Sequence, residues 1–182
     1  EFGAHGEHLY SLARGIDDRP VTASHETKSV SQERTFDRDT VDEAQIRRCL
    51  LDCAEGVGGE LRRKGLMART ITLKLRYHDF ETRSRSVTLP LPSDVDDVIY
   101  MTACTLLSRE WKSRRKVRLV GLRASNLLSD VAYQLQLFHQ DTDKQARVAR
   151  VIDDIRARFG DDAITRASLL EGRRPEQRSV DN

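Results

Sequence analysis

The sequence predicts an α+β fold: a four-stranded antiparallel sheet with two helices on one face, plus a helical C-terminal tail. The clearest signal is residues 68–77, where polar and apolar side chains alternate, because a strand with one buried face has a period of two. The apolar positions of this strand are Ile71, Leu73, Leu75 and Tyr77. Around it, the signals follow the order strand, helix, strand, strand, helix, strand, which is the split βαβ arrangement.

The first strand and the first helix of this arrangement are predicted at residues 28–36 and 40–64. Thr40 and Glu43 have the spacing of a capping box, in which two side chains satisfy free N–H groups at a helix start. Gly65 should end the helix, because glycine readily takes the left-handed conformation found after many helices. The buried side of this helix is expected to carry Val41, Ala44, Cys49, Cys53, Val57 and Leu61.

The second half of the arrangement follows a turn. The expected elements are a turn at 78–81, a strand at 82–89, a helix ending near Trp111 and a strand at 117–123. Pro90 and Pro92 should close the third strand, because proline cannot donate to a sheet ladder. Ser93 or Asp94 should cap the helix. Its buried stripe is expected at Val95, Val98, Ile99, Leu106 and Trp111.

Both ends of the chain read differently from this middle part. Residues 2–15 predict a short helix that Gly15 stops, and residues 16–27 are polar, contain Pro20 and are typical of a linker.

After the fourth strand, residues 134–138 form a short amphipathic segment. Thr142 and Gln145 then predict another capped helix, which extends to Phe159. Its apolar residues are Val148, Ile152, Ile155 and Phe159. From Glu171 the chain is Arg-rich and polar, a composition that indicates disorder.

Composition and charge limit the class of protein. The 182 residues are 38% hydrophobic and 33% charged, with no long apolar run and no signal peptide, so we expect neither membrane spanning nor secretion. Residues 62–123 hold 15 Lys and Arg against 6 Asp and Glu, a charge of +9, which leaves −7 for the rest of a chain of net charge +2. A basic centre between acidic flanks favours a polyanionic partner.

Neither the cysteines nor the paired carboxylates have the pattern of a metal site. Cys49, Cys53 and Cys104 form no CxxC pair, and free thiols of this kind are typical of a reducing compartment, so we expect a cytoplasmic protein. The adjacent aspartates at 96–97 and 153–154 fall on predicted helices, where sequence neighbours point about 100° apart. No phosphate-binding loop, HExxH motif or hydrolase triad is found.

The exposed side of the predicted sheet is the best candidate for a binding surface. It should carry the following basic and hydroxyl side chains: Lys74, Arg76, Ser84, Ser86, Thr88, Lys116 and Arg118. Such groups are the usual phosphate contacts, and the absence of aromatic side chains among them favours duplex backbone over stacked single strands. Val120 and Leu122 share the parity of Arg118, so they interrupt this pattern unless a bulge redirects them.

Several stretches of the chain resemble one known family. Residues 13–21, 28–36 and 117–127 are similar, in family order, to the C-terminal third of the Y-family translesion DNA polymerases, of the DNA polymerase IV type. Residues 158–170 resemble the tail of bacterial members, so the resemblance extends from Phe2 to about Leu170.

The resemblance implies a domain order. By it, residues 1–15 are the end of the thumb, 16–27 a linker, 28–127 the little finger DNA-binding domain, 128–142 a clamp-binding segment and 143–182 a helical tail with a disordered end. The little finger of this family lays its sheet in the major groove of duplex DNA and grips phosphates. To the basic and hydroxyl residues above, the resemblance adds Lys28, Ser29 and Arg34 as expected DNA contacts.

The short peptide by which bacterial members bind the sliding clamp is the second implied site. Gln134, Leu135, Leu137 and Phe138 resemble it, although 44 residues follow Phe138 here and well-known members carry the peptide at the C-terminus.

The family's catalytic carboxylates belong to the palm domain, which nothing in this chain matches. We therefore expect DNA binding without catalysis and without a cofactor, whereas the parent polymerase would use Mg²⁺. The implied partners are double-stranded primer–template DNA, the sliding clamp and the palm, fingers and thumb of the polymerase, with no membrane. The residues alone leave two alternatives open: an RNA-binding split βαβ module, and a protein-interaction domain without nucleic acid.

Overall fold

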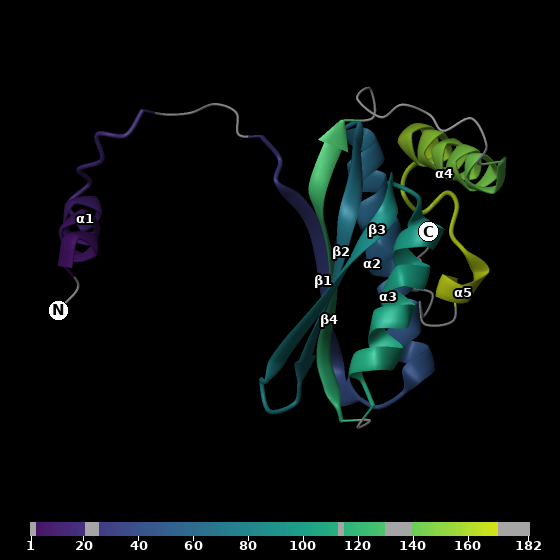
Figure 1. Cartoon of the computed structure of the whole chain (residues 1–182), viewed down its shortest axis with the longest axis horizontal. Helices are drawn as coiled ribbons and strands as arrows, with labels where there is room; N and C mark the ends of the chain where they lie inside the picture. Colours follow the sequence, from purple (N-terminus) through teal and green to yellow (C-terminus); the bar gives the residue numbers. More distant parts are fainter. Residues whose placement is uncertain (1–2, 21–25, 113–114, 130–139, 171–182) are drawn as a thin grey trace, which may run out of the picture.

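The structure is a computed structural model that describes residues 3–20, 26–112, 115–129 and 140–170 (Figure 1). Its elements in chain order are α1 (Gly3–Ala13), β1 (Ser29–Thr40), α2 (Glu43–Arg63), β2 (Leu66–Tyr77), β3 (Thr82–Ser93), α3 (Asp96–Glu110), β4 (Val117–Ser129), α4 (Gln140–Phe159) and α5 (Ala167–Leu170). The helix predicted before Gly15 is present as α1. No helix in these ranges has the length and apolar character needed to cross a membrane.

The four strands form one antiparallel sheet in the order β1-β4-β2-β3, and α2 and α3 cover one of its faces (Figure 1). The predicted fold class is therefore confirmed. All four strands are longer than predicted, at 12 or 13 residues each.

The core lies between the sheet and the two helices. The alternation of β2 is confirmed, because Ile71, Leu73, Leu75 and Tyr77 are all at most 2% exposed. Facing them are Ile46, Leu50, Val57 and Leu61 of α2 and Ile99 and Leu107 of α3, which belong to the same buried cluster.

Helix α2 begins later than its predicted cap. Asp42 is the N-cap residue, and its carboxylate accepts from the backbone N–H groups of Ala44 and Gln45. Thr40 is instead the last residue of β1, where its hydroxyl accepts from the backbone N–H of Asp42. The prediction that Val41 and Ala44 are buried was wrong, because both are exposed around this start. Gly65 follows the helix with a φ of 62°, as predicted.

The third strand does not close at its two prolines. Pro90 and Pro92 lie within β3, which continues to Ser93. Its pairing with β2 shifts register between Thr88 and Ser93, so both prolines lie in an irregular stretch of an edge strand, where proline is tolerated. The predicted cap of α3 was also wrong, because Val95 is the N-cap and has no capping side chain. The Ser93 hydroxyl accepts from the N–H of Val95 just before the helix.

A bulge in β4 decides which of its side chains reach the core. Arg76 pairs with Leu119, but Tyr77 pairs with Val117, so Arg118 is the extra residue on the β4 side. This insertion reverses the parity of the strand, and Val120 and Leu122 are consequently buried at 0% and 2% exposure. The two apolar residues that interrupted the predicted polar face therefore belong to the core.

The C-terminal helices α4 and α5 lie on the helix side of the domain and contact α2 (Figure 1). Helix α4 begins at Gln140, so Thr142 is inside it and the predicted cap is wrong. Of its predicted apolar side chains, Ile152 and Ile155 are partly covered, while Val148 and Phe159 are 51% and 75% exposed.

An ionic cluster, here called the tail clasp, connects these C-terminal helices to α2. Arg62 donates to Asp153 at 2.5 Å, and Glu55 lies 2.8 Å from both Arg156 and Arg166. The Arg62 side chain is only 6% exposed, so the pair with Asp153 is largely shielded from water.

Candidate nucleic-acid interface

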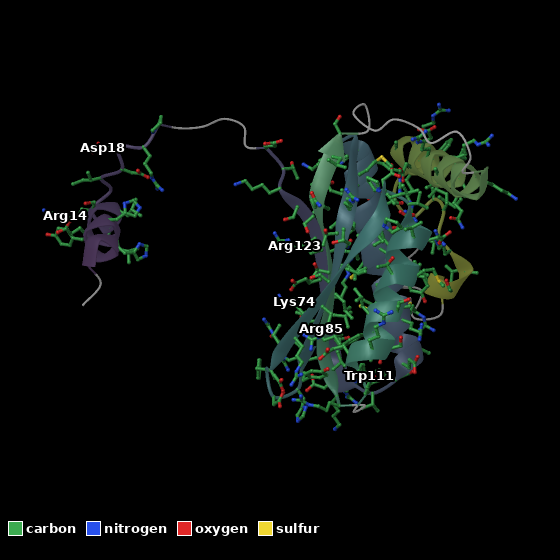
Figure 2. The ribbon with its side chains drawn as sticks, viewed as in Figure 1. Arg14, Asp18, Lys74, Arg85, Trp111 and Arg123 are labelled. Atoms are coloured by element: carbon green, nitrogen blue, oxygen red, sulfur yellow. The ribbon has the colours of Figure 1, made fainter. Side chains whose placement is uncertain are left out.

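The sheet surface opposite α2 and α3, here called the open face, is built from aligned rows of side chains. Strand register fixes four rows, which run from β1 across β4 and β2 to β3: Ser29–Ser125–Thr70–Thr88, Ser31–Arg123–Thr72–Ser86, Glu33–Gly121–Lys74–Ser84 and Thr35–Leu119–Arg76–Thr82. Hydroxyl side chains occupy most of these positions, and no aromatic side chain occurs among them. Figure 2 shows Lys74 and Arg123 on the side of the sheet away from the helices.

Hydroxyl pairs connect β2 to β3 on the open face. The Thr72 hydroxyl donates to Ser86 at 3.2 Å, and the hydroxyls of Thr70 and Thr88 are 3.5 Å apart. Arg76 of β2 makes a similar contact to β3, because its Nε donates to the Thr82 hydroxyl at 3.0 Å. These contacts hold hydroxyl and guanidinium groups in fixed positions on a polar surface, which suits repeated contacts to phosphate oxygens.

The charges on the four rows are three cations and one carboxylate. The cations are Lys74, Arg76 and Arg123, and the carboxylate is Glu33. Lys74 Nζ donates to both Glu33 oxygens, at 2.8 and 3.0 Å. Arg123 is exposed and has no hydrogen-bond or ion-pair partner among the described residues.

Sequence reasoning missed Arg123 as a candidate contact. Within the predicted strand at 117–123, Arg123 has the same parity as Val117, which is buried. The bulge at Arg118 is what places it on the open face. A register shift of this kind leaves no signal in the alternation of a single strand.

Of the predicted contact residues, Ser29, Lys74, Arg76, Ser84, Ser86 and Thr88 all lie in the four rows. Lys28 and Lys116 are exposed directly before β1 and β4. Arg118, in the bulge, stacks over the Phe80 ring at 4.7 Å and lies 3.7 Å from Asp39. These are placements only, and DNA contact by these residues stays a prediction.

Arg34 does not belong to the open face. It pairs with Val120, whose side chain is buried under the helices, so Arg34 has the inward parity. Its guanidinium donates to Asp52 of α2 at 2.8 Å. Arg34 therefore joins β1 to the helix side, and DNA contact by this residue stays a prediction.

The β2–β3 hairpin carries an exposed aromatic ring at its turn. Phe80 has a φ of 65° and is 64% exposed. Arg115 braces the turn from the start of β4, with its guanidinium 2.5 Å from Asp79 and 2.6 Å from Glu81. The hydrogen bond from Arg115 holds the pKa of Glu81 below its ordinary value.

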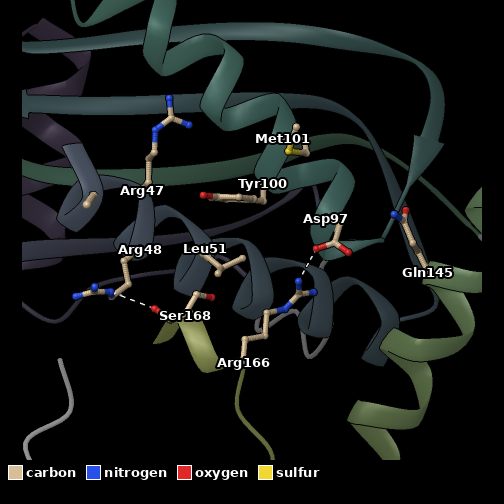
Figure 3. Close-up of a pocket in the computed structure, with 10 residues that line it drawn as sticks. Arg47, Arg48, Leu51, Asp97, Tyr100, Met101, Gln145, Arg166 and Ser168 are labelled. Carbon is tan, nitrogen blue, oxygen red and sulfur yellow. Dashed lines mark hydrogen bonds and ion pairs between the residues drawn. The ribbon is translucent and has the colours of Figure 1, made fainter. Parts of the chain in front are cut away.

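The helix side has a cavity of about 540 Å³ between α2, α3 and the C-terminal helices (Figure 3). Arg47, Tyr100, Met101 and Gln145 line it, and Arg166 closes one edge by donating to Asp97 at 2.5 Å. This cavity and the open face are on opposite sides of the sheet, so the two are independent surfaces.

Metal and thiol chemistry have no evident centre in the described ranges. No group of three His, Cys, Asp or Glu side chains there could hold a metal ion. Cys49, Cys53 and Cys104 are free, as expected, and Cys53 and Cys104 are buried. A hydrogen bond with Cys49, together with burial, raises the pKa of Cys53 and keeps it protonated.

Comparison with known proteins identifies the protein family of this chain. A family model described as the C-terminal domain of the impB/mucB/samB family matches residues 27–137. The chain therefore belongs to this family, and its sheet and two helices are the little finger domain of a Y-family DNA polymerase. The relatives narrow the assignment further, to the DNA polymerase IV type.

Curated relatives cover nearly all of the chain. It is 35% identical to DNA polymerase IV of Opitutus terrae over 96% of its length, and 36% identical to that of Moorella thermoacetica over 94%. The match to Alkalilimnicola ehrlichii is 39% over 75%. The chain spans less than half of these relatives, at 44%, 43% and 39% of their lengths.

Among the solved structures that match part of the chain are the following two. One is a complex of the β-clamp processivity factor and the little finger domain of PolIV, with a TM-score of 0.47, 23% identity, and coverage of 61% of this chain and 99% of that chain. Another is a Y-family DNA polymerase chimera, with a TM-score of 0.43, 20% identity, and coverage of 70% and 36%.

Proposed function

We propose that this little finger grips duplex DNA through its open face, as part of a translesion DNA polymerase that acts in DNA repair and damage bypass. The observation that carries the proposal is the composition of the four rows, in which hydroxyls and three cations lie opposite the helices without an aromatic ring. Phosphate oxygens accept from such groups whatever the base sequence. Single-strand binders instead stack bases on aromatic side chains, so the RNA-binding alternative is not favoured.

Charge distribution supports the same surface. Arg123 is available to a phosphate, Arg76 is bonded to a neutral hydroxyl, and Lys28 and Lys116 extend the positive charge at two strand starts. On the opposite side of the sheet, the arginines of the tail clasp are paired with Asp153 and Glu55. The cations of the open face that no described carboxylate pairs with, Arg76 and Arg123, are therefore the ones expected to attract an approaching duplex.

The test is duplex binding as a function of salt concentration, measured by fluorescence anisotropy. Replacing Lys74, Arg76 and Arg123 with Ala should weaken binding and reduce the slope of log K against log salt by about 2, since each phosphate contact contributes roughly 0.9 and Lys74 is already paired with Glu33. The matched control replaces three cations of the helix side: Arg63, Lys64 and Arg109. Equal losses in both variants would assign DNA binding to the wrong face.

We also propose that residues 134–138 recruit a sliding clamp to the parent enzyme. Support comes from the resemblance of Gln134, Leu135, Leu137 and Phe138 to the bacterial clamp peptide and from membership in the family. These four residues lie outside the described ranges, so the proposal rests on sequence alone. Two apolar anchors in a short segment would concentrate the binding energy in few side chains.

Catalysis is proposed for the parent protein and not for this chain. The relatives that are longer than the chain are DNA polymerases, and a Mg²⁺ site built from palm carboxylates would belong to a part of the parent enzyme that this chain does not match. The role proposed for this fragment is to hold the product duplex and the clamp while the rest of the enzyme acts.

A further inference from the structure

The ion pair on the open face crosses a strand that lies between its two partners. Glu33 is on β1 and Lys74 on β2, and β4 separates these strands. Neighbouring strands are about 4.8 Å apart, so the side chains must span roughly 10 Å of sheet. Both pair across the sheet with Gly121, and the two therefore meet directly above this residue.

Gly121 provides the space for that crossing. A Cβ atom there would be 2.6 Å from Glu33 Cγ, which is closer than real Cβ atoms come, and 3.3 Å from both Glu33 Cβ and the Gln32 carbonyl oxygen. With any other residue at 121, the Glu33 side chain or the neighbouring β1 backbone would have to move. The glycine therefore leaves the carboxylate lying across the sheet, against Lys74 Nζ.

The three cations of the rows consequently differ in their availability. Arg123 has no partner among the described residues, and Arg76 is bonded to the neutral Thr82 hydroxyl. Of these three cations, only Lys74 is bonded to a carboxylate. Both oxygens of Glu33 accept from its ammonium group. The Lys74 and Glu33 side chains are 31% and 40% exposed, so an external anion can reach the pair.

We propose that Glu33 competes with DNA phosphate for Lys74, and that it limits the strength of the grip on duplex DNA. This inference rests on the proposed function of the open face. In the free protein the carboxylate occupies the position of a phosphate oxygen. A bound duplex must displace it or share Lys74 with it, beside a negative charge that repels the backbone. The result is a grip that releases easily, which suits a domain that must slide along its product.

The experiment compares Glu33→Gln with Glu43→Gln in salt titrations with a fluorescent duplex of mixed sequence. Glu43 pairs with Arg47 on the helix side, so the control makes the same chemical change away from the open face. Glu33→Gln should bind duplex about twofold to fivefold more tightly, the range that follows from the worth of an exposed ion pair. Its salt slope should steepen by about 0.9, because one more cation contacts phosphate. Glu43→Gln should match wild type.

A double-mutant cycle tests whether Glu33 acts through Lys74. In a Lys74→Ala background, Glu33→Gln should gain little, because the cation that it frees is gone. The melting temperatures of all these variants are measured on the same samples, so that a change in duplex affinity is not mistaken for a change in folding.

The outcomes separate this inference from the function on which it rests. Unchanged affinity in Glu33→Gln, with normal salt-dependent binding by wild type, overturns the competition and leaves the open face as the DNA surface. A gain that persists in the Lys74→Ala background also overturns it, because Glu33 then acts by general repulsion. A wild-type chain with no salt-dependent duplex binding overturns both proposals.

Discussion

Arg166 Nε lies 2.8 Å from Oε1 of Glu55, so a residue after α4 pairs with a buried carboxylate in the middle of α2. The same carboxylate accepts from Arg156 of α4 at 2.8 Å. Glu55 is only 8% exposed, and a buried carboxylate is tolerated only where cations and hydrogen bonds compensate for lost water. The C-terminal helices are therefore an integral layer of the domain on its helix side.

The first prediction concerns this tail clasp. Glu55→Gln should lower the free energy of unfolding by about 1–3 kcal/mol, because two arginines lose their common anion. In a chain of this size that corresponds to a fall in Tm of several degrees, measurable by circular dichroism. Glu43→Gln, which breaks an exposed pair with Arg47, should change Tm little. Equal Tm values for the two variants would contradict a stabilising role of the tail clasp.

The burial of Glu55 also makes it unsuitable as a neutral control for DNA binding. A change there combines lost charge with lost stability. Exposed residues of the helix side, such as Arg63 and Arg109, test the surface without disturbing the core.

The second prediction concerns acid and the β2–β3 turn. The pKa of Glu81 is lowered from an ordinary value of 4.5 because Arg115 donates to its carboxylate. A lowered folded pKa means that this stabilisation is complete above pH 4.5 and is lost as the pH falls through the folded value. Between pH 5 and 3, wild type should therefore lose more Tm than Glu81→Gln. Parallel curves for the two proteins would contradict the pairing with Arg115.

The third prediction concerns catalysis. The family match covers residues 27–137, and the chain spans less than half the length of its DNA polymerase IV relatives. Because the family's catalytic carboxylates belong to the palm, which this chain does not match, we expect no product in a primer-extension assay with Mg²⁺ and all four nucleotides. Extension that survives rigorous purification and tracks with the protein would contradict the domain assignment.

The fourth prediction concerns the clamp. Leu137→Ala combined with Phe138→Ala should abolish binding to a sliding clamp, at a cost of roughly 2–5 kcal/mol by analogy with interface hot spots. Tm and duplex affinity should barely change, and both are measured on the same samples. The rival interpretation is that these side chains pack on the little finger, in which case Tm falls by several degrees. A destabilised variant that still binds clamp normally would end the recruitment proposal for this segment.

The sequence predicted an element well where its polar and apolar residues alternate regularly or its capping residue is unambiguous. The strict alternation of β2 identified its buried residues, because no bulge interrupts it from Thr70 to Arg76. In β1 the alternation is weak, so the sequence does not show which side of the sheet Arg34 is on. The structure places it on the helix side, where it donates to Asp52, 18 residues away in the chain. The start of α2 was misplaced because Thr40 and Asp42 are both good caps, and Thr40 belongs to the end of β1.

The open face was predicted in part. The hydroxyls and cations of β2 and β3 were predicted from the period of two in their sequences. Arg123 was not, because the side of the sheet on which it lies depends on the bulge at Arg118. The pair between Glu33 and Lys74 was also beyond sequence reasoning. It needs the strand order and a glycine at the crossing, neither of which a single strand reveals.

The prolines within β3 have a consequence for how the domain behaves among other chains. An exposed sheet edge offers N–H and C=O groups to any passing strand, which is a common route to aggregation. Pro90 and Pro92 provide no N–H groups at their end of β3, which is an edge strand. A strand added there would find gaps in its hydrogen-bond ladder. The same residues that failed to stop β3 should therefore discourage sheet growth between molecules, and help to keep the domain separate at high concentration.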